Sequence, residues 1–248
     1  MKLIRRLTLA SILLCLLTTS TLAGDFATLN FIGFSKDGRY LAFEEFGTQD
    51  GSGFPYSNVY VVDVVKNVYA SKPVAVRIDD EKATERLARS RSKLGASSAF
   101  RKFGILAGNT GKLVVSRQLT DLSVNHFLSE HPGDTQKIKF AEIVGSMYQG
   151  GDWELILKSV AVKTKDCAYV GEDSKVYMLD LSIHDNEGNR TTTLQKDSAL
   201  PSGRGCPTNY AMQYVYLYQD YAAVFVSKYT IGFEGPDMRY MVVTGKIK

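Results

Sequence analysis

The residues best suited to binding chemistry lie near the C-terminus, in a Gly-Phe-Glu-Gly-Pro-Asp segment that begins at Gly232. Two glycines and a proline in six residues favour an exposed turn with a constrained backbone. Glu234, Asp237 and Arg239 place three charges around that turn. We predict that these three residues form a binding surface. The structural alternative is that Asp237 bonds turn amides and Arg239 pairs with a neighbouring acid.

Cys167 and Cys206 form the second candidate pair. The only other cysteine, Cys15, lies in a leader that we expect to be removed. Two distant cysteines with no histidine beside them do not make a zinc site. In a compartment that permits oxidation, we predict a disulfide that closes a loop of about 40 residues. A pair of free buried thiols is the alternative.

Metal and cofactor motifs are not found, so we predict neither. His126 and His131 are five residues apart, whereas zinc-protease helices separate their histidines by three or four. The segment Gly108–Lys112 resembles part of a phosphate loop, but Leu106 stands where the first glycine is needed and Leu113 replaces the hydroxyl residue. We therefore expect a surface loop at the histidines and a turn into a strand at Gly108–Lys112.

Catalytic motifs are equally scarce. The chain has no Gly-x-Ser-x-Gly elbow, the commonest signature of exported esterases. Glu44 and Glu45 are adjacent, but neighbouring residues of a strand point to opposite faces and cannot act together. A hydrolase would have to draw its two carboxylates from separate strands.

The elements that must position these residues are mostly strands, because apolar residues recur at period two between regularly spaced turn clusters. Asp185–Asn189 is a strong hairpin turn. Tyr214, Tyr216 and Tyr218 share one strand face with apolar residues opposite, which favours a doubly packed core strand over an exposed aromatic platform. The expected strands are 29–34, 39–46, 58–65, 74–78, 112–118, 137–143, 153–162, 175–183, 190–195, 210–218, 221–229 and 239–247.

One surface α-helix is expected over 80–93, capped by Asp79 or Asp80. Its apolar stripe is thin, which favours a position on the surface. Four cations recur at spacings of four, three and four and so stack on one face: Lys82, Arg86, Arg89 and Lys93. A solvated helix face is the simpler interpretation, and an anion-binding surface is the alternative.

The N-terminal 23 residues resemble a secretory signal, with a basic start, a short apolar run and small residues before a cleavage site after Ala23. The apolar run is too short for a stable membrane anchor. Removing the leader lowers the net charge from +4 to +1 and gives no electrostatic case for nucleic-acid binding. We expect a periplasmic or secreted protein.

Two resemblances extend these expectations. The segment Phe34–Phe43 is similar to the hairpin repeat of TolB-like and WD40-like β-propellers, and Gly232–Val243 partly repeats it. A second set of segments occurs in the same order in a bacterial family of predicted secreted proteins described only as a domain of unknown function: the first hairpin, Arg117–Thr120, Leu200–Pro207 and Gly232–Asp237. That resemblance implies export and a single conserved unit, and it brings no activity.

The sequence therefore predicts a signal peptide over 1–23 and one exported domain over 24–248. The domain is expected to be mainly β and antiparallel, propeller-like or a β-sandwich, with one surface α-helix. We expect a non-catalytic binding or interaction protein without a cofactor, whose partner is a protein or glycan of the cell envelope. The alternative is a hydrolase of cell-wall or extracellular polymers.

Overall fold

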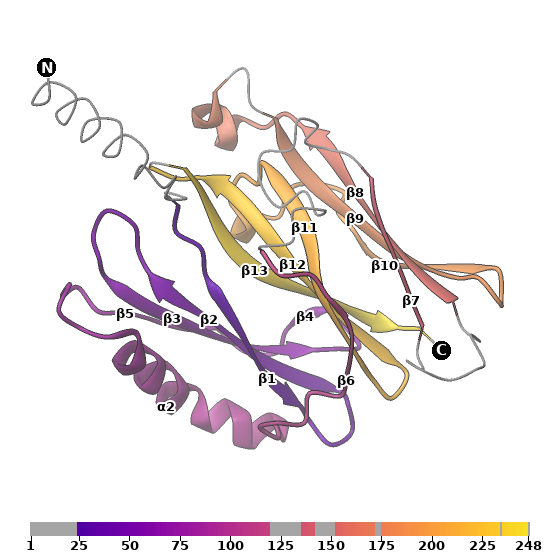
Figure 1. Cartoon of the computed structure of the whole chain (residues 1–248), viewed down its shortest axis with the longest axis horizontal. Helices are drawn as coiled ribbons and strands as arrows, with labels where there is room; N and C mark the ends of the chain where they lie inside the picture. Colours follow the sequence, from indigo (N-terminus) through magenta and orange to yellow (C-terminus); the bar gives the residue numbers. More distant parts are fainter. Residues whose placement is uncertain (1–23, 120–134, 142–151, 172–174, 234, 248) are drawn as a thin grey trace, which may run out of the picture.

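The structure is a computed structural model that describes residues 24–119, 135–141, 152–171, 175–233 and 235–247. Three antiparallel sheets lie one above another (Figure 1). The first sheet contains β1 (Thr28–Phe34), β2 (Tyr40–Thr48), β3 (Pro55–Asp63), β4 (Val68–Tyr69) and β5 (Val74–Arg77). The central sheet contains β6 (Lys112–Ser116), β11 (Asn209–Tyr218), β12 (Tyr221–Ile231) and β13 (Pro236–Lys246). The third contains β7 (Gln136–Ala141), β8 (Asp152–Val162), β9 (Val176–Asp185) and β10 (Arg190–Lys196).

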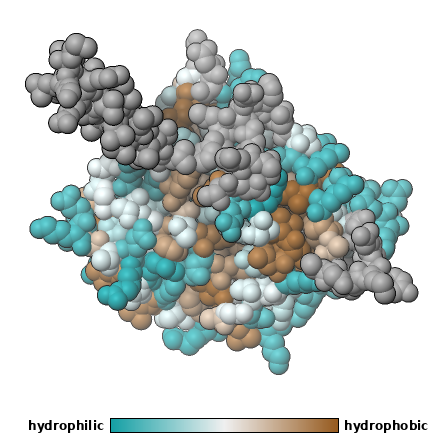
Figure 2. All heavy atoms as spheres, in the orientation of Figure 1, coloured by the Kyte–Doolittle hydropathy of each residue, from teal (hydrophilic) through white to brown (hydrophobic). Residues whose placement is uncertain are grey.

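The central sheet is buried on both faces because its strands carry apolar residues at successive positions. In β12, Val224 and Val226 pack with the third sheet, whereas Ala223 and Phe225 pack with the first. The molecule therefore has two hydrophobic cores, one on each side of the same sheet. This is the pattern of a strand covered on both faces. On the face shown in Figure 2, hydrophobic residues gather across the middle and hydrophilic residues surround them.

The sequence predicts either a propeller-like fold or a β-sandwich. The stacked sheets correspond to a β-sandwich, and the propeller-like motif is not confirmed. The two segments that carry the motif are hairpin turns. In the first, between β1 and β2, the Ser35 hydroxyl donates to Asp37 at 2.6 Å and Gly38 adopts a φ of +70°. The second joins β12 to β13. The turn at Asp185–Asn189 also forms as expected, with the Asp185 carboxylate accepting from Gly188 N at 3.0 Å.

The helix is α2 (Glu85–Phe103), which begins later and ends later than the sequence predicts. Thr84 caps it by accepting a hydrogen bond from Leu87 N at 3.3 Å, and Asp80 instead accepts from the Lys82 amide in the turn before it. The helix packs on the outer face of the first sheet through its small residues Ala88, Ser92 and Ala96 (Figure 1). Small side chains allow this close approach, and no broad apolar stripe is needed.

Candidate functional site

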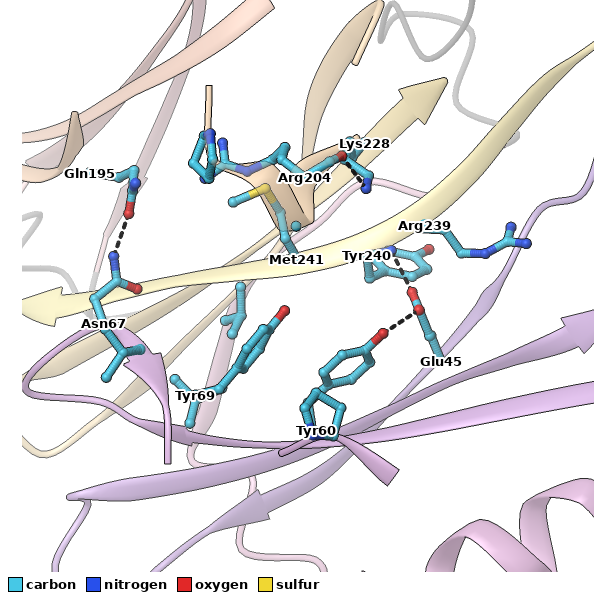
Figure 3. Close-up of a pocket in the computed structure, with 16 residues that line it drawn as sticks. Glu45, Tyr60, Asn67, Tyr69, Gln195, Arg204, Lys228, Arg239, Tyr240 and Met241 are labelled. Carbon is cyan, nitrogen blue, oxygen red and sulfur yellow. Dashed lines mark hydrogen bonds between the residues drawn. The ribbon is translucent and has the colours of Figure 1, made fainter. Parts of the chain in front are cut away.

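A cleft of about 710 Å³ lies along the edge strand β13 of the central sheet, and we call it the edge cleft. Its floor is β13. One wall comes from β2, β3 and β4 of the first sheet, and the other from β10, β12 and the short 3-10 helix η2 (Ser202–Arg204) (Figure 3). At one end Asn67 donates to the Gln195 side chain at 2.6 Å and bridges the two walls. The cleft is therefore built by all three sheets.

The first wall is aromatic. Phe43 stacks on Tyr60 with ring centroids 4.7 Å apart, and Tyr60 stacks on Tyr69 at 5.3 Å. This row runs from the core outward, and Tyr69 at its end is 52% exposed. Burial raises the pKa of Tyr60, helped by the neighbouring Glu45 carboxylate, so its hydroxyl keeps its proton at neutral pH. The wall offers a flat apolar surface with polar tips, which suits ring-shaped or apolar groups.

Glu45 lies at the base of this wall and is 2% exposed. Its carboxylate accepts hydrogen bonds from Tyr60 Oη at 2.7 Å, Asn58 Nδ2 at 3.2 Å and the Tyr240 amide at 2.8 Å. Glu44 points to the opposite face of the sheet, under the helix, as the alternation along the strand predicts. Glu45 is the one carboxylate among the described residues that line the cleft.

The second wall is cationic. Arg204 donates to Asp197 at 2.7 Å, and this ion pair fixes η2. Burial opposes the charge of Arg204, but Tyr210 and Asp197 outweigh burial and raise the Arg204 pKa. Lys228 donates to the Arg204 carbonyl oxygen at 2.7 Å. Burial lowers the pKa of Lys228, and the positive charges of Arg204 and Arg239 add to this effect although Glu45 opposes it.

Lys228 differs from the two arginines in its partners. Within the described part of the chain, no carboxylate lies within ion-pair distance of its ammonium group, whereas Arg204 and Arg239 each have an aspartate. A partly buried cation that contacts only a carbonyl oxygen has lost water without gaining an opposite charge. An anionic group in the cleft would supply that charge.

The charged C-terminal turn holds the chain's N-terminal segment. Arg239 donates to the Asp25 carbonyl at 2.7 Å and to its carboxylate, and its guanidinium lies 4.6 Å from the Tyr56 ring centre. Asp237 accepts from the Asp25 amide at 3.2 Å, and burial raises its pKa. Arg239 borders the edge cleft, but its guanidinium points away from it in Figure 3.

These contacts bear on the predicted binding surface. Glu234 lies outside the described residues, so the structure does not test whether the three charges come together. The two that are described make structural contacts of the kind the alternative interpretation requires, although their partner is a distant segment and not the turn itself. Ligand binding by Glu234, Asp237 and Arg239 stays a prediction.

Cys167 and Cys206 form the predicted disulfide, with their Cα atoms 5.6 Å apart. Cys167 belongs to the 3-10 helix η1 (Lys165–Val170) and Cys206 follows η2 by two residues. The bridge therefore anchors the segment that carries Arg204 into the cleft wall. Both sulfur-bearing residues are buried with Val170 and Val176 in a small core of their own.

The remaining residues that the sequence analysis considered for binding either make contacts within the fold or lie outside the described residues. Of the four stacked cations, Arg89 and Lys93 each pair with the buried Glu44 at 3.0 Å, so this face is only partly solvated. The tyrosine row of β11 packs against the core of the first sheet, which confirms the core-strand interpretation. His126 and His131 lie outside the described residues. Among the described side chains, no three of His, Cys, Asp or Glu gather in a way that could hold a metal ion.

Sequence reasoning missed the four residues that define the two walls: Tyr60, Tyr69, Arg204 and Lys228. Tyr60 lies in a strand that the sequence predicts, whereas Tyr69 lies in a two-residue strand that it does not predict. The cations lie more than a hundred residues further along the chain. Only the pairing of the sheets brings these groups together, and no local motif marks them.

Comparison with known protein families gives a match that covers most of the chain. The sequence model of a family described as a predicted secreted protein (DUF2259) matches residues 42–246. A search of curated proteins finds no significant match. In the part of the chain that the structure describes, no helix is both long and apolar enough to cross a membrane.

Proposed function

We propose that the chain, which belongs to the DUF2259 family of predicted secreted proteins, is a non-catalytic binding protein of the cell envelope that holds its ligand in the edge cleft. Its first 23 residues direct it to the periplasm or the medium and are removed in the course of export by cleavage after Ala23. The partner is an envelope protein or glycan.

The observation that carries this proposal is the composition of the cleft. Its walls offer stacked tyrosines on one side and Lys228 with Arg204 on the other, a combination that recognises a ligand with an apolar and an anionic part. The alternative hydrolase needs two carboxylates across a substrate. Glu45 stands alone among the described lining residues and already accepts three hydrogen bonds.

A blocked cleft tests the proposal. Gly203 lines the cleft, and a Cβ atom added there meets no atom within 4 Å, so we expect Gly203→Trp to fill the cleft without disturbing the fold. The matched control is Lys158→Trp on the exposed outer face of β8. The purified exported protein is incubated with the isolated envelope proteins and cell-wall glycans of its own host.

We expect the unmodified protein and the Lys158→Trp control to be retained equally and Gly203→Trp to lose most of that retention. Equal retention of all three would refute a role for the cleft. Soluble fragments released from the glycans, in amounts that fall when Glu45 is replaced by glutamine, would establish the hydrolase instead.

A further inference from the structure

The floor of the edge cleft is a strand edge with unused backbone groups. The Met238 amide of β13 donates to Asp25 O at 2.9 Å, on the side away from β12. Because β12 and β13 pair without a register shift, every second residue of β13 has this orientation. The amide and carbonyl groups of the even-numbered residues therefore point away from β12. The Tyr240 amide donates to Glu45 at 2.8 Å, and the Thr244 amide donates to Asn67 at 2.9 Å. Between these two contacts lies Val242.

Among the described residues, the amide and the carbonyl of Val242 have no hydrogen-bond partner. The stretch from Tyr240 to Thr244 spans about 14 Å of strand. An exposed edge of this kind is a template for one more strand. The edge of β13 is thus closed at both ends by side chains and open in the middle, where the cleft lies.

The chain already uses the same edge in this way. The segment Asp25–Ala27 runs parallel to β13, with the Ala27 amide donating to Met238 O at 3.0 Å. It then leaves the edge to begin β1 at Thr28. An added strand at Val242 would use the next open part of this edge, in the cleft, and an antiparallel strand would form both hydrogen bonds through the one residue opposite Val242.

We infer that the edge cleft binds a short extended peptide that carries an acidic side chain, and that the peptide backbone pairs with Val242 as an added strand of the central sheet. This inference rests on the proposed function and specifies its ligand. The peptide runs antiparallel to β13, so its residue opposite Val242 donates to the Val242 carbonyl and accepts from the Val242 amide.

The alternation of side chains along a strand then fixes which groups the peptide needs. The residue opposite Val242 points to the same side as Val242, which is the core side of the first sheet with the tyrosine wall and Glu45. An apolar residue fits there, and an acid would meet Glu45. Its neighbours point toward Lys228 and Arg204 (Figure 3). The acidic side chain therefore belongs at a neighbouring position, where it meets the cation that has no carboxylate.

The test uses the purified exported protein labelled with ¹⁵N and the acetylated, amidated peptide Thr-Glu-Val-Glu-Thr. We expect the amide signals of residues 241–243 to shift on titration and exchange of the Val242 amide hydrogen to slow. The same peptide with N-methyl valine at its centre lacks the backbone donor and should not bind. The peptide with glutamine in place of both glutamates should bind about tenfold more weakly.

Two protein variants test whether Lys228 is the cation that binds the acidic side chain of the peptide. Lys228→Gln should weaken binding of the acidic peptide about tenfold and leave the glutamine peptide unaffected. The matched control, Lys246→Gln, removes an exposed cation of the same sheet that pairs with Asp220 at 3.6 Å, and it should change nothing. The unmodified protein with the three peptides carries the test even where Lys228→Gln fails to fold.

The inference is overturned if the acidic peptide leaves the signals of 241–243 unchanged, or if the N-methylated peptide binds equally well. Trigalacturonic acid serves as the glycan probe. If it shifts signals of the cleft where the peptides do not, the peptide inference fails and the proposed binding function stands. If neither probe binds and Gly203→Trp leaves envelope retention intact, both fail.

Discussion

The ion-pair cluster beneath α2 gives the sharpest test of how this fold is stabilised. Glu44 is fully buried and accepts hydrogen bonds from Asn30, Ser57 and Arg89, and from Lys93 in an ion pair at 3.0 Å. The side chains of Arg89 and Lys93 are 30% and 40% exposed. The charge that cannot reach water is therefore the carboxylate, and removing the cations should cost more than removing the acid.

Two perturbations separate these costs. Arg89→Met with Lys93→Met leaves a buried carboxylate without an opposite charge, which should lower the free energy of unfolding by about 3–5 kcal/mol at pH 7. Glu44→Gln leaves cations that can turn toward water, and it should cost about 1–3 kcal/mol. Arg86→Met with Arg91→Met, two exposed positions of the same helix, is the control and should change stability by less than about 0.5 kcal/mol.

The dependence on pH should change sign. In the unmodified protein burial alone would raise the Glu44 pKa, but the hydrogen bonds from Arg89 and Lys93 outweigh burial and hold it below its ordinary value of 4.5. Glu44 therefore stabilises the fold above that pH, and this stability is lost as the pH falls through the lowered value. Without the cations, burial raises the pKa above 4.5, so protonation as the pH falls should restore stability.

Urea unfolding followed by circular dichroism at pH 7 and about pH 5 measures both effects. The destabilisation of the double methionine variant should be smaller at the lower pH, and the Glu44→Gln variant should show no such recovery. The reasoning is refuted if the double variant is as stable as the Arg86 and Arg91 control, or if its deficit is the same at both pH values.

Three further outcomes are expected. Replacing Cys167 and Cys206 with serine should lower the unfolding free energy by about 4 kcal/mol, and thiol titration of the denatured, unreduced protein should find the cysteines blocked. Arg239→Ala should cost about 1–3 kcal/mol because it breaks the contacts to Asp25, and an unchanged melting temperature would return Arg239 to the list of ligand-binding candidates. N-terminal sequencing of the exported protein should begin at Gly24, and a retained leader would contradict the signal-peptide interpretation.

The sequence was sufficient for all the described strands except β4, because their signal is local. The runs of apolar residues between turn clusters predicted β12 and the tyrosine row of β11 to within a few residues, and the Asp-Asn-Glu-Gly-Asn turn placed one hairpin. The helix shows the limit of such signals. The face of the helix that contacts the sheet consists of Ala88, Ser92 and Ala96, and small residues of this kind do not produce a clear apolar periodicity. The burial of the helix and its length were therefore underestimated.

The edge cleft could not be predicted in this way. Glu45 and Lys228 line the same cleft only because the central sheet lies beside the first sheet, and nothing within a window of ten or twenty residues reports that packing. The same holds for Arg239, whose partner Asp25 is 214 positions away. The sequence showed charges at a turn, and the fold places two of them, Asp237 and Arg239, in contact with Asp25.

The composition of the central sheet also determines when, during synthesis, the protein can fold. Three of its four strands are the last three of the chain, and both hydrophobic cores need them. A nascent chain that lacks residues 209–246 has two outer sheets and nothing to place between them, so neither core can close during synthesis. Long-range pairing of this kind delays folding until the C-terminal segment arrives. The architecture therefore prevents the native state from forming until the last strands are free to join.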